Sequence, residues 1–330
     1  MKSFDLLCVA VLSLLCPAVV SAADPVSELA EFSVFGKVDP AALAKAEIKT
    51  AAGPPMSTER YLSVQACLVV PQPPSKVIEN MRHFDPTAHR ELKVFLHSDM
   101  PASPTAANFS KLNNAPKNSA VERLRNATQK MVPDLQLSRA EAQQFASGQQ
   151  PFDFWAKILA GRAQSFATGG AATAAPYDHT GQPVQPGKEL AGLVRQQAKV
   201  NRQFGGFLGN TGLIGGKGSL KPELYWELLQ VEDEGVLTLG ASYSRATQGG
   251  GYQTADGLYY ASGGYYVALT LYQLWPIDIG GRASTLVWRG DFTSARSLGE
   301  LHGIERLASE SAMRKDISKA VQIFKSENSR

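Results

Sequence analysis

Two segments near the start of the chain alternate between hydrophobic and polar residues. In residues 60–70, RYLSVQACLVV, every second residue from Leu62 onward is aliphatic, which predicts a half-buried strand. Residues 90–98, RELKVFLHS, alternate in the same way. Between them, residues 71–86 carry prolines followed by apolar residues at helical spacing. We therefore expect a strand, a proline-led helix and a second strand in this order.

The apolar spacing becomes helical between residue 101 and about residue 215. Three segments of this block place apolar residues on one side of a helix: 117–132, 151–166 and 187–204. The residues between the last two segments are rich in Gly, Ala and Pro, as is typical of a loop. We expect a long helical block between two strand regions.

Strand patterns return after residue 222. Short turns separate five segments with strand character: 223–231, 235–244, 251–262, 264–275 and 282–292. Short turns between neighbouring strands are typical of an antiparallel meander. The chain then closes with a set of apolar residues at helical spacing, namely Leu301, Ile304, Ala308, Met313, Ile317, Val321 and Phe324. This spacing predicts a long amphipathic helix with a bend near residues 309–311.

The first 22 residues have the pattern of a secretory signal peptide. Lys2 precedes an apolar run that ends at Val20, and small residues follow where a signal peptidase would cut. The run is shorter than the roughly 20 apolar residues that a membrane-spanning helix needs, and no later uncharged run reaches that length. We expect a signal peptide over residues 1–22 and one domain over residues 23–330, secreted or periplasmic, with no transmembrane segment after cleavage.

Composition and charge narrow the classes of function. The 330 residues are 44% hydrophobic, which is enough for a large core. The formal net charge of +3 is small and the basic residues are scattered, so we expect no nucleic-acid partner. Once the signal is removed, Cys67 is the remaining cysteine, so the fold depends on its core and not on an internal disulfide.

The sequence contains no recognisable catalytic or metal-binding constellation. His89 begins HREL, which lacks the second histidine of a HExxH zinc site, and the other histidines have no metal-like spacing. Residues 209–219, GNTGLIGGKGS, differ from a phosphate loop, because Thr211 replaces its first glycine and Gly218 its magnesium-binding Ser or Thr. We expect no catalytic residues, no metal ion and no cofactor.

Aromatic residues gather in the second strand region. Six of the ten tyrosines lie within residues 252–272. A tyrosine has a broad apolar ring and a polar tip, which suits either the wall of a cavity or the outer face of a sheet. In the segment that starts at residue 265, Tyr266, Thr270 and Tyr272 fall on one face with Ala268, and this face is expected to meet either water or a ligand.

Arg289 and Asp291 lie two residues apart on the last predicted strand and therefore on one face. They form either a weak ion pair on a solvated outer face, or a cavity mouth at which Arg289 orients an anionic head group. The residues that we expect to line a ligand site are Trp226, Tyr266, Thr270, Tyr272 and Arg289.

The order of elements resembles the START-like (helix-grip) superfamily. The resemblance covers about residues 60–98 and 222–327, and it includes the strand, the proline-containing link from Pro74 to Val77 and the final long helix. It implies a curved antiparallel sheet that grips the final helix, with a ligand cavity between them. The helical block of about residues 101–215 departs from the compact pattern and would be an insertion.

Three hypotheses of function follow. In the first, an exported protein binds an apolar or amphipathic small molecule, such as a lipid, between the sheet and the C-terminal helix. The second is an enzyme of cyclase or hydrolase type on the same scaffold, using Arg289, Asp291 or His302. The third is a cell-envelope interaction protein with a solid core and a protein partner that contacts residues 101–215.

Overall fold

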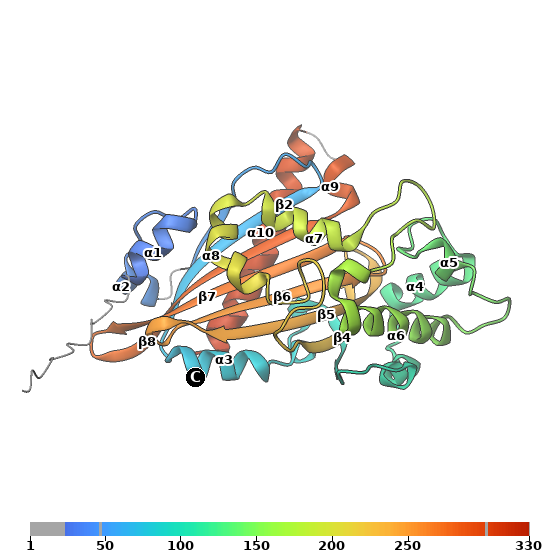
Figure 1. The fold of residues 1–330 in the computed structure, drawn as a ribbon, viewed down its shortest axis with the longest axis horizontal. Helices are drawn as coiled ribbons and strands as arrows, with labels where there is room; N and C mark the ends of the chain where they lie inside the picture. The colour runs from blue at the N-terminus through green and yellow to red at the C-terminus, as the bar shows by residue number, and fades with distance from the viewer. Residues whose placement is uncertain (1–23, 46–47, 301–302, 330) are drawn as a thin grey trace, which may run out of the picture.

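The computed structural model describes residues 24–45, 48–300 and 303–329. These residues form an α+β fold built on one eight-stranded antiparallel sheet, as Figure 1 shows. The expected α+β class with an antiparallel sheet is therefore confirmed. The expected signal peptide, residues 1–22, lies outside the described residues, as do Leu301 and His302.

The sheet has the order β1-β2-β8-β7-β6-β5-β4-β3. Its strands are β1 (Lys49–Ala52), β2 (Tyr61–Val70), β3 (Val94–Met100), β4 (Glu223–Val231), β5 (Glu234–Ala246), β6 (Tyr252–Ala261), β7 (Val267–Ile279) and β8 (Arg282–Ser294). From β3 to β8 each strand pairs with the next one along the chain, which confirms the expected meander. The alternating segment of residues 60–70, which comes before the meander in the sequence, forms β2 and pairs with the last strand, β8.

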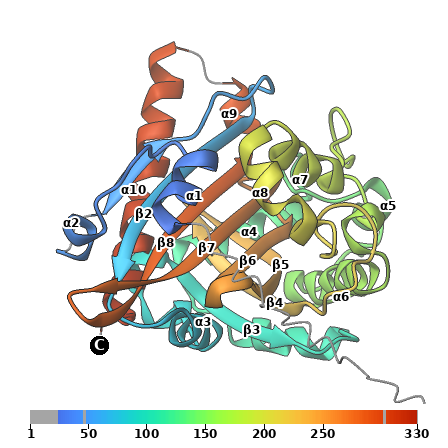
Figure 2. The ribbon, with the colours of Figure 1, turned by 60° about the vertical axis from the view of Figure 1, so that its left-hand side comes forward.

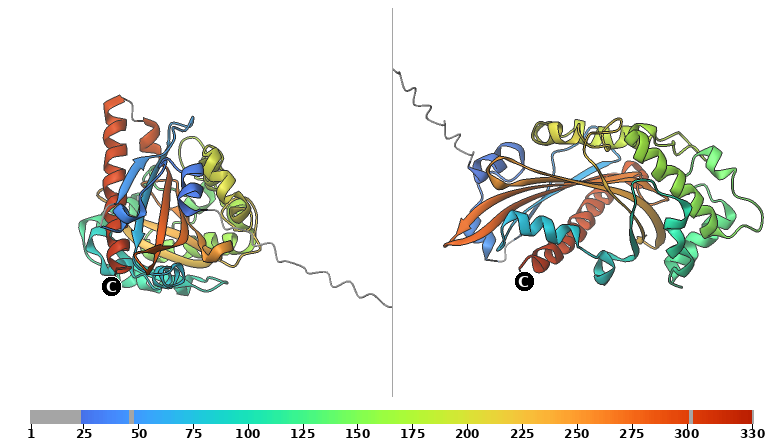
Figure 3. Two further views of the ribbon diagram at one scale, coloured as in Figure 1. Left: turned by 90° about the vertical axis from the view of Figure 1, so that its left-hand side faces the viewer. Right: turned by 60° about the horizontal axis from the view of Figure 1, so that its bottom comes forward.

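Helices cover both faces of this sheet, as the right-hand view of Figure 3 shows. The helices are α1 (Pro25–Phe32), α2 (Pro40–Ala44), α3 (Pro74–Arg82), α4 (Ser119–Lys130), α5 (Arg139–Ala142), α6 (Pro151–Gly169), α7 (Pro186–Arg195), α8 (Ala198–Leu208), α9 (Arg296–Glu300) and α10 (Gly303–Glu327). One face carries α3 and α10, while α7 and α8 lie across the other. Figure 2 shows α1 and α8 in front of the strands and α10 behind β2.

The larger hydrophobic core lies on the face covered by α1, α7 and α8 and extends to α4 and α6. Phe166 of α6 stacks on Tyr259 of β6 with 3.8 Å between the ring centroids, so α6 also packs onto the sheet. A smaller core on the opposite face joins Val64 and Leu68 of β2 to Ile317 and Val321 of α10. The sheet therefore has no apolar face left open to water along β2.

Strand β2 is buried along its whole length, so the prediction of a half-buried strand was wrong. The alternation itself is correct, because Leu62, Val64 and the residues that follow at every second position pack toward α10. The side chains between them enter the larger core instead. Cys67 is one of these, and burial raises the pKa of its thiol to about 12. This thiol is part of the packing and is not reactive at neutral pH.

Residues 101–215 are helical, as expected, with one difference. The segment 187–204 forms two helices, because Gln197 leaves the helical conformation between α7 and α8. Its amide donates to the backbone oxygen of Pro54 at 3.0 Å, which ties the interruption to the loop before β2. The helix α10 continues through residues 309–311 as one element. Within the described parts of the chain, no helix has the length and apolar character needed to span a bilayer.

Candidate functional site

A cavity of about 430 Å³ lies between the sheet and the two helices α3 and α10. We call it the α3–α10 cavity. Its lining combines apolar side chains from the helices and strands with polar side chains from the sheet. The apolar residues include Met81, Phe84, Leu258, Ala268 and Phe324, and the polar residues of the floor include Tyr225, Thr254, Asp256, Thr270, Tyr272 and Arg289. Its volume lies in the range of small-molecule sites, about 300–1,000 Å³.

The helices and the link after α3 supply much of the apolar wall. Met81 and Phe84 come from α3 and the residues that follow it, and Phe324 comes from α10. The Phe324 ring lies 5.7 Å from the ring of Tyr272, which joins the final helix to the floor of the cavity. Phe84 is one of two large apolar side chains classed as exposed among the described residues, and it stacks on His89. An exposed aromatic ring therefore marks the mouth of the cavity.

The polar floor follows one row of paired residues across five strands. Glu223, Ser242, Asp256, Thr270 and Asp291 are successive partners from β4 to β8. Directly paired residues of antiparallel strands point to the same face of a sheet, here the face of α3 and α10. Three carboxylates are thus brought to one row by strand register, although they are far apart in sequence.

A glycine allows the ring of Tyr225 to lie over β5 and reach Asp256. A Cβ atom at Gly240 would lie 2.1 Å from Cζ of Tyr225, so only glycine leaves space for this ring. The pairing of β5 with β6 is irregular at the same position. The hydroxyl of Tyr225 donates a hydrogen bond to Oδ1 of Asp256 at 2.6 Å.

The environment of Asp256 disfavours its ionised form. Burial raises the pKa of this carboxyl to about 6, although the hydrogen bond from Tyr225 acts in the opposite direction. The hydroxyl of Tyr225 has a pKa raised well above its ordinary value, mainly through burial and next through the charge of Asp256. Tyr225 therefore stays protonated and remains a hydrogen-bond donor to Asp256.

Arg289 and Asp291 form a buried bidentate ion pair beside Asp256. Nε of Arg289 donates to Oδ2 of Asp291 at 2.8 Å, and Nη2 donates to Oδ1 at 2.7 Å. Their side chains are only 14% and 9% exposed, so the interpretation as a solvated outer face was wrong. Thr270 also donates to Oδ1 of Asp291, at 3.0 Å. Asp291 thus occupies the Nε/Nη2 edge of the guanidinium and compensates its charge.

A second acid–base pair lies at the edge of the cavity. Nδ1 of His97 is 3.0 Å from Oε1 of Glu227, and Nε2 is 3.6 Å from Asp99. Burial by itself lowers the pKa of His97, but Glu227 and Asp99 together raise it above its ordinary value. The imidazole is therefore held by carboxylates of β4 and β3 on both sides.

Three of the five residues expected at a ligand site line the α3–α10 cavity: Thr270, Tyr272 and Arg289. Trp226 does not, because it points to the opposite face of β4. There it is fully buried against Phe109, and its Nε1 donates to the backbone oxygen of Asn108 at 3.0 Å. Trp226 therefore belongs to the larger core. Because helices cover both faces of the sheet, a large apolar side chain can be buried on either face.

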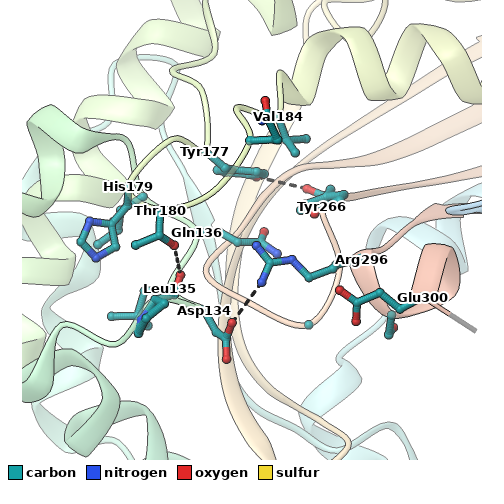
Figure 4. Close-up of a pocket in the computed structure, with 15 residues that line it drawn as sticks. Asp134, Leu135, Gln136, Tyr177, His179, Thr180, Val184, Tyr266, Arg296 and Glu300 are labelled. Atoms are coloured by element: carbon teal, nitrogen blue, oxygen red, sulfur yellow. Dashed lines mark hydrogen bonds and ion pairs between the residues drawn. The ribbon is translucent and has the colours of Figure 1, made fainter.

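Tyr266 also lies away from this cavity, beside a cleft of about 300 Å³ shown in Figure 4. It precedes β7, and the face alternation of the strand begins only after it. The backbone oxygen of Tyr266 accepts from the hydroxyl of Tyr177 at 3.1 Å. Arg296 pairs with Asp134 at 3.1 Å in the same cleft, so these polar groups already satisfy one another. These contacts join segments that are far apart in the sequence.

Tyr225, Thr254 and Asp256 were not predicted from the sequence to line the site. A signal for Asp256 exists, because aspartate is depleted in strands and this one lies in the middle of an alternating segment. The contact of Tyr225 with Asp256 depends on the register of β4, β5 and β6 and on the position of Gly240 beneath the ring. The spacing of residues in the sequence does not reveal this register.

Among the residues that the structure describes, no group of three or more His, Cys, Asp or Glu side chains is arranged to hold a metal ion. His302, one residue of the catalytic hypothesis, lies outside the described residues. Comparisons of the chain with models of protein families, with curated proteins and with solved structures found no match.

Proposed function

We propose that this chain is a binding protein that takes up an apolar or amphipathic small molecule, such as a lipid, in the α3–α10 cavity. The observation that carries the proposal is the cavity itself, about 430 Å³, with an apolar wall from both helices and a polar floor on the sheet. Ligand sites in proteins commonly combine apolar walls with a few well-placed polar groups. The exposed ring of Phe84 supplies an apolar surface at the entrance.

The proposal also includes the fold superfamily and the export of the protein. It takes the chain to be a START-like domain in which the sheet grips α10 and in which residues 101–215 are an insertion. The support is the position of the cavity between an antiparallel sheet and the long C-terminal helix α10. It also takes the protein to be exported, on the pattern of residues 1–22.

The hypothesis of an envelope-interaction protein receives less support. It requires a solid sheet and an exposed apolar patch on residues 101–215. The two large apolar side chains classed as exposed among the described residues, Val34 and Phe84, both lie outside that block. The apolar residues of its helices, such as Trp155 and Phe204, are buried in the larger core.

A neutral fluorescent probe tests the proposal. N-phenyl-1-naphthylamine is expected to bind the purified protein with a Kd on the order of 10 μM and a rise in fluorescence. Ala268 lies on the cavity floor between Leu258 and Thr293 in the strand register. Ala268→Phe should fill the cavity and weaken binding about tenfold or more, because the added ring occupies the space of the probe.

The matched control is Ala283→Phe, which adds the same ring to an exposed position near the start of the same β7–β8 pair. This variant should bind the probe as the unchanged protein does. Equal binding by all three proteins would place the probe elsewhere on the molecule, and no binding by the unchanged protein would remove the proposal.

A further inference from the structure

We infer that the ligand of the α3–α10 cavity carries a protonated amine, and that Asp256, with Tyr225 and Thr254 beside it, binds this group. The inference rests on the proposed function and adds the chemical class of the ligand. It starts from a carboxylate on the cavity floor whose hydrogen-bonding capacity the protein uses only in part.

Asp256 differs in its partners from the other carboxylates that line the cavity and from the neighbouring Asp291. Basic side chains lie within about 4 Å of the others, in the pairs Arg82–Glu223, Arg289–Asp291, His97–Glu227, His97–Asp99 and His89–Glu327. Within the described part of the chain, no Lys, Arg or His nitrogen lies within 4 Å of Asp256, which accepts a hydrogen bond from the neutral hydroxyl of Tyr225. A buried carboxylate is costly unless a cation or several donors compensate it.

A second polar group on the same strand is also unsatisfied. Oγ1 of Thr254 is buried and has no hydrogen-bond partner, and the residue is only 4% exposed. Thr254 lies two residues before Asp256 on β6, so both side chains point into the cavity, and both line it. Of the unpartnered buried side-chain atoms in the described residues, this one belongs to the cavity lining. An ammonium group has three donors and can serve Thr254 and Asp256 together.

The arginine charges of the cavity are each paired with a carboxylate of the protein. Asp291 accepts from two nitrogens of Arg289. Arg82 lies at the exposed edge of the cavity, where its Nε is 3.3 Å from Glu223. The arrangement therefore disfavours an anionic head group at Arg289, which was one of the two alternatives for this residue, and it favours a cation at Asp256.

The positions of the apolar residues give the orientation of the ligand. Leu258 and Ala268 lie beside Asp256 on the floor, and Met81, Phe84 and Phe324 form walls toward the helices. The ammonium group would rest on the sheet, with an aliphatic tail directed along these walls. The chemical class is thus an amphipathic amine, of natural or synthetic origin.

Calorimetry with three ligands that share the same alkyl tail distinguishes a cationic, a neutral and an anionic head group. The measurement is made at pH 8, where Asp256 is ionised and an alkylamine is still protonated. The probes are octylammonium, octanol and octanoate. The expected order is octylammonium about tenfold tighter than octanol, with octanoate weakest, because the charged donor gains the contacts of Asp256 and Thr254. In Asp256→Asn, which keeps the side-chain shape, the ratio of amine to alcohol affinity should fall to about one.

The control for net charge is Asp316→Asn, because Asp316 is an exposed carboxylate of α10 outside the cavity lining. This variant should keep the tenfold ratio. A ratio near one in the unchanged protein, with octanol bound, would overturn the amine inference and leave the proposed function standing. A tenfold ratio that survives in Asp256→Asn would also overturn it. Failure of all three ligands to bind would overturn both.

Discussion

Replacing Asp291 with alanine is expected to lower the free energy of unfolding by about 3–5 kcal/mol. The change leaves the guanidinium of Arg289 buried at 14% exposure without the two hydrogen bonds from its Nε and Nη2. It also removes the acceptor of the Thr270 hydroxyl. An uncompensated buried charge is one of the few changes that produce a loss of this size. Urea denaturation at pH 7 measures it.

The control for this prediction removes both charges. Arg289→Met combined with Asp291→Leu leaves no buried ion, so the pair should cost less than Asp291→Ala alone. An exposed ion pair contributes only about 0–1 kcal/mol. If Asp291→Ala lowers the free energy of unfolding by less than about 1 kcal/mol, the pair behaves as an exposed ion pair and the assignment to a buried site is contradicted.

Trp226→Ala is expected to lower the free energy of unfolding by about 3–5 kcal/mol through loss of packing. Trp226 is fully buried against Phe109 in the larger core, on the face of the sheet away from the α3–α10 cavity. Trp226→Phe should cost less, because it keeps most of the packing and loses the hydrogen bond to Asn108. Chemical denaturation measures both variants.

Trp226→Phe also tests which face of β4 contacts the ligand. Probe binding by Trp226→Phe, measured where the protein is folded, should equal that of the unchanged protein. A marked loss of affinity with little loss of stability would place Trp226 in the binding site and contradict the face assignment.

Alternation in the sequence predicted seven of the eight strands, β2 to β8, and the order of the meander, whereas β1 was not predicted. The segment 223–231 is β4 with the same ends, and residues 60–70 contain β2. Alternation assigns side chains to two faces, but it does not say what covers each face. The strand β2 was expected to be half-buried, and Arg289 was left between water and a cavity, for this reason.

The site was predicted only in part because strand register and one glycine create it. Thr270, Tyr272 and Arg289 share a face that the sequence pattern could identify. Asp256 meets Thr270 through the pairing of β6 with β7, and Tyr225 reaches Asp256 because Gly240 has no side chain. Tyr266 was assigned to the same face as Thr270, but regular alternation begins only with β7 at Val267.

Native mass spectrometry of the freshly purified protein tests the central claim most directly. The account predicts a species heavier than the polypeptide by one small molecule, and extraction with organic solvent should release that molecule and return the mass to that of the chain. Ala268→Phe should lack the added mass, because its ring occupies the cavity, while Ala283→Phe should retain it. A bound molecule retained equally by Ala268→Phe, or a protein that carries no ligand and binds no probe, would contradict the account.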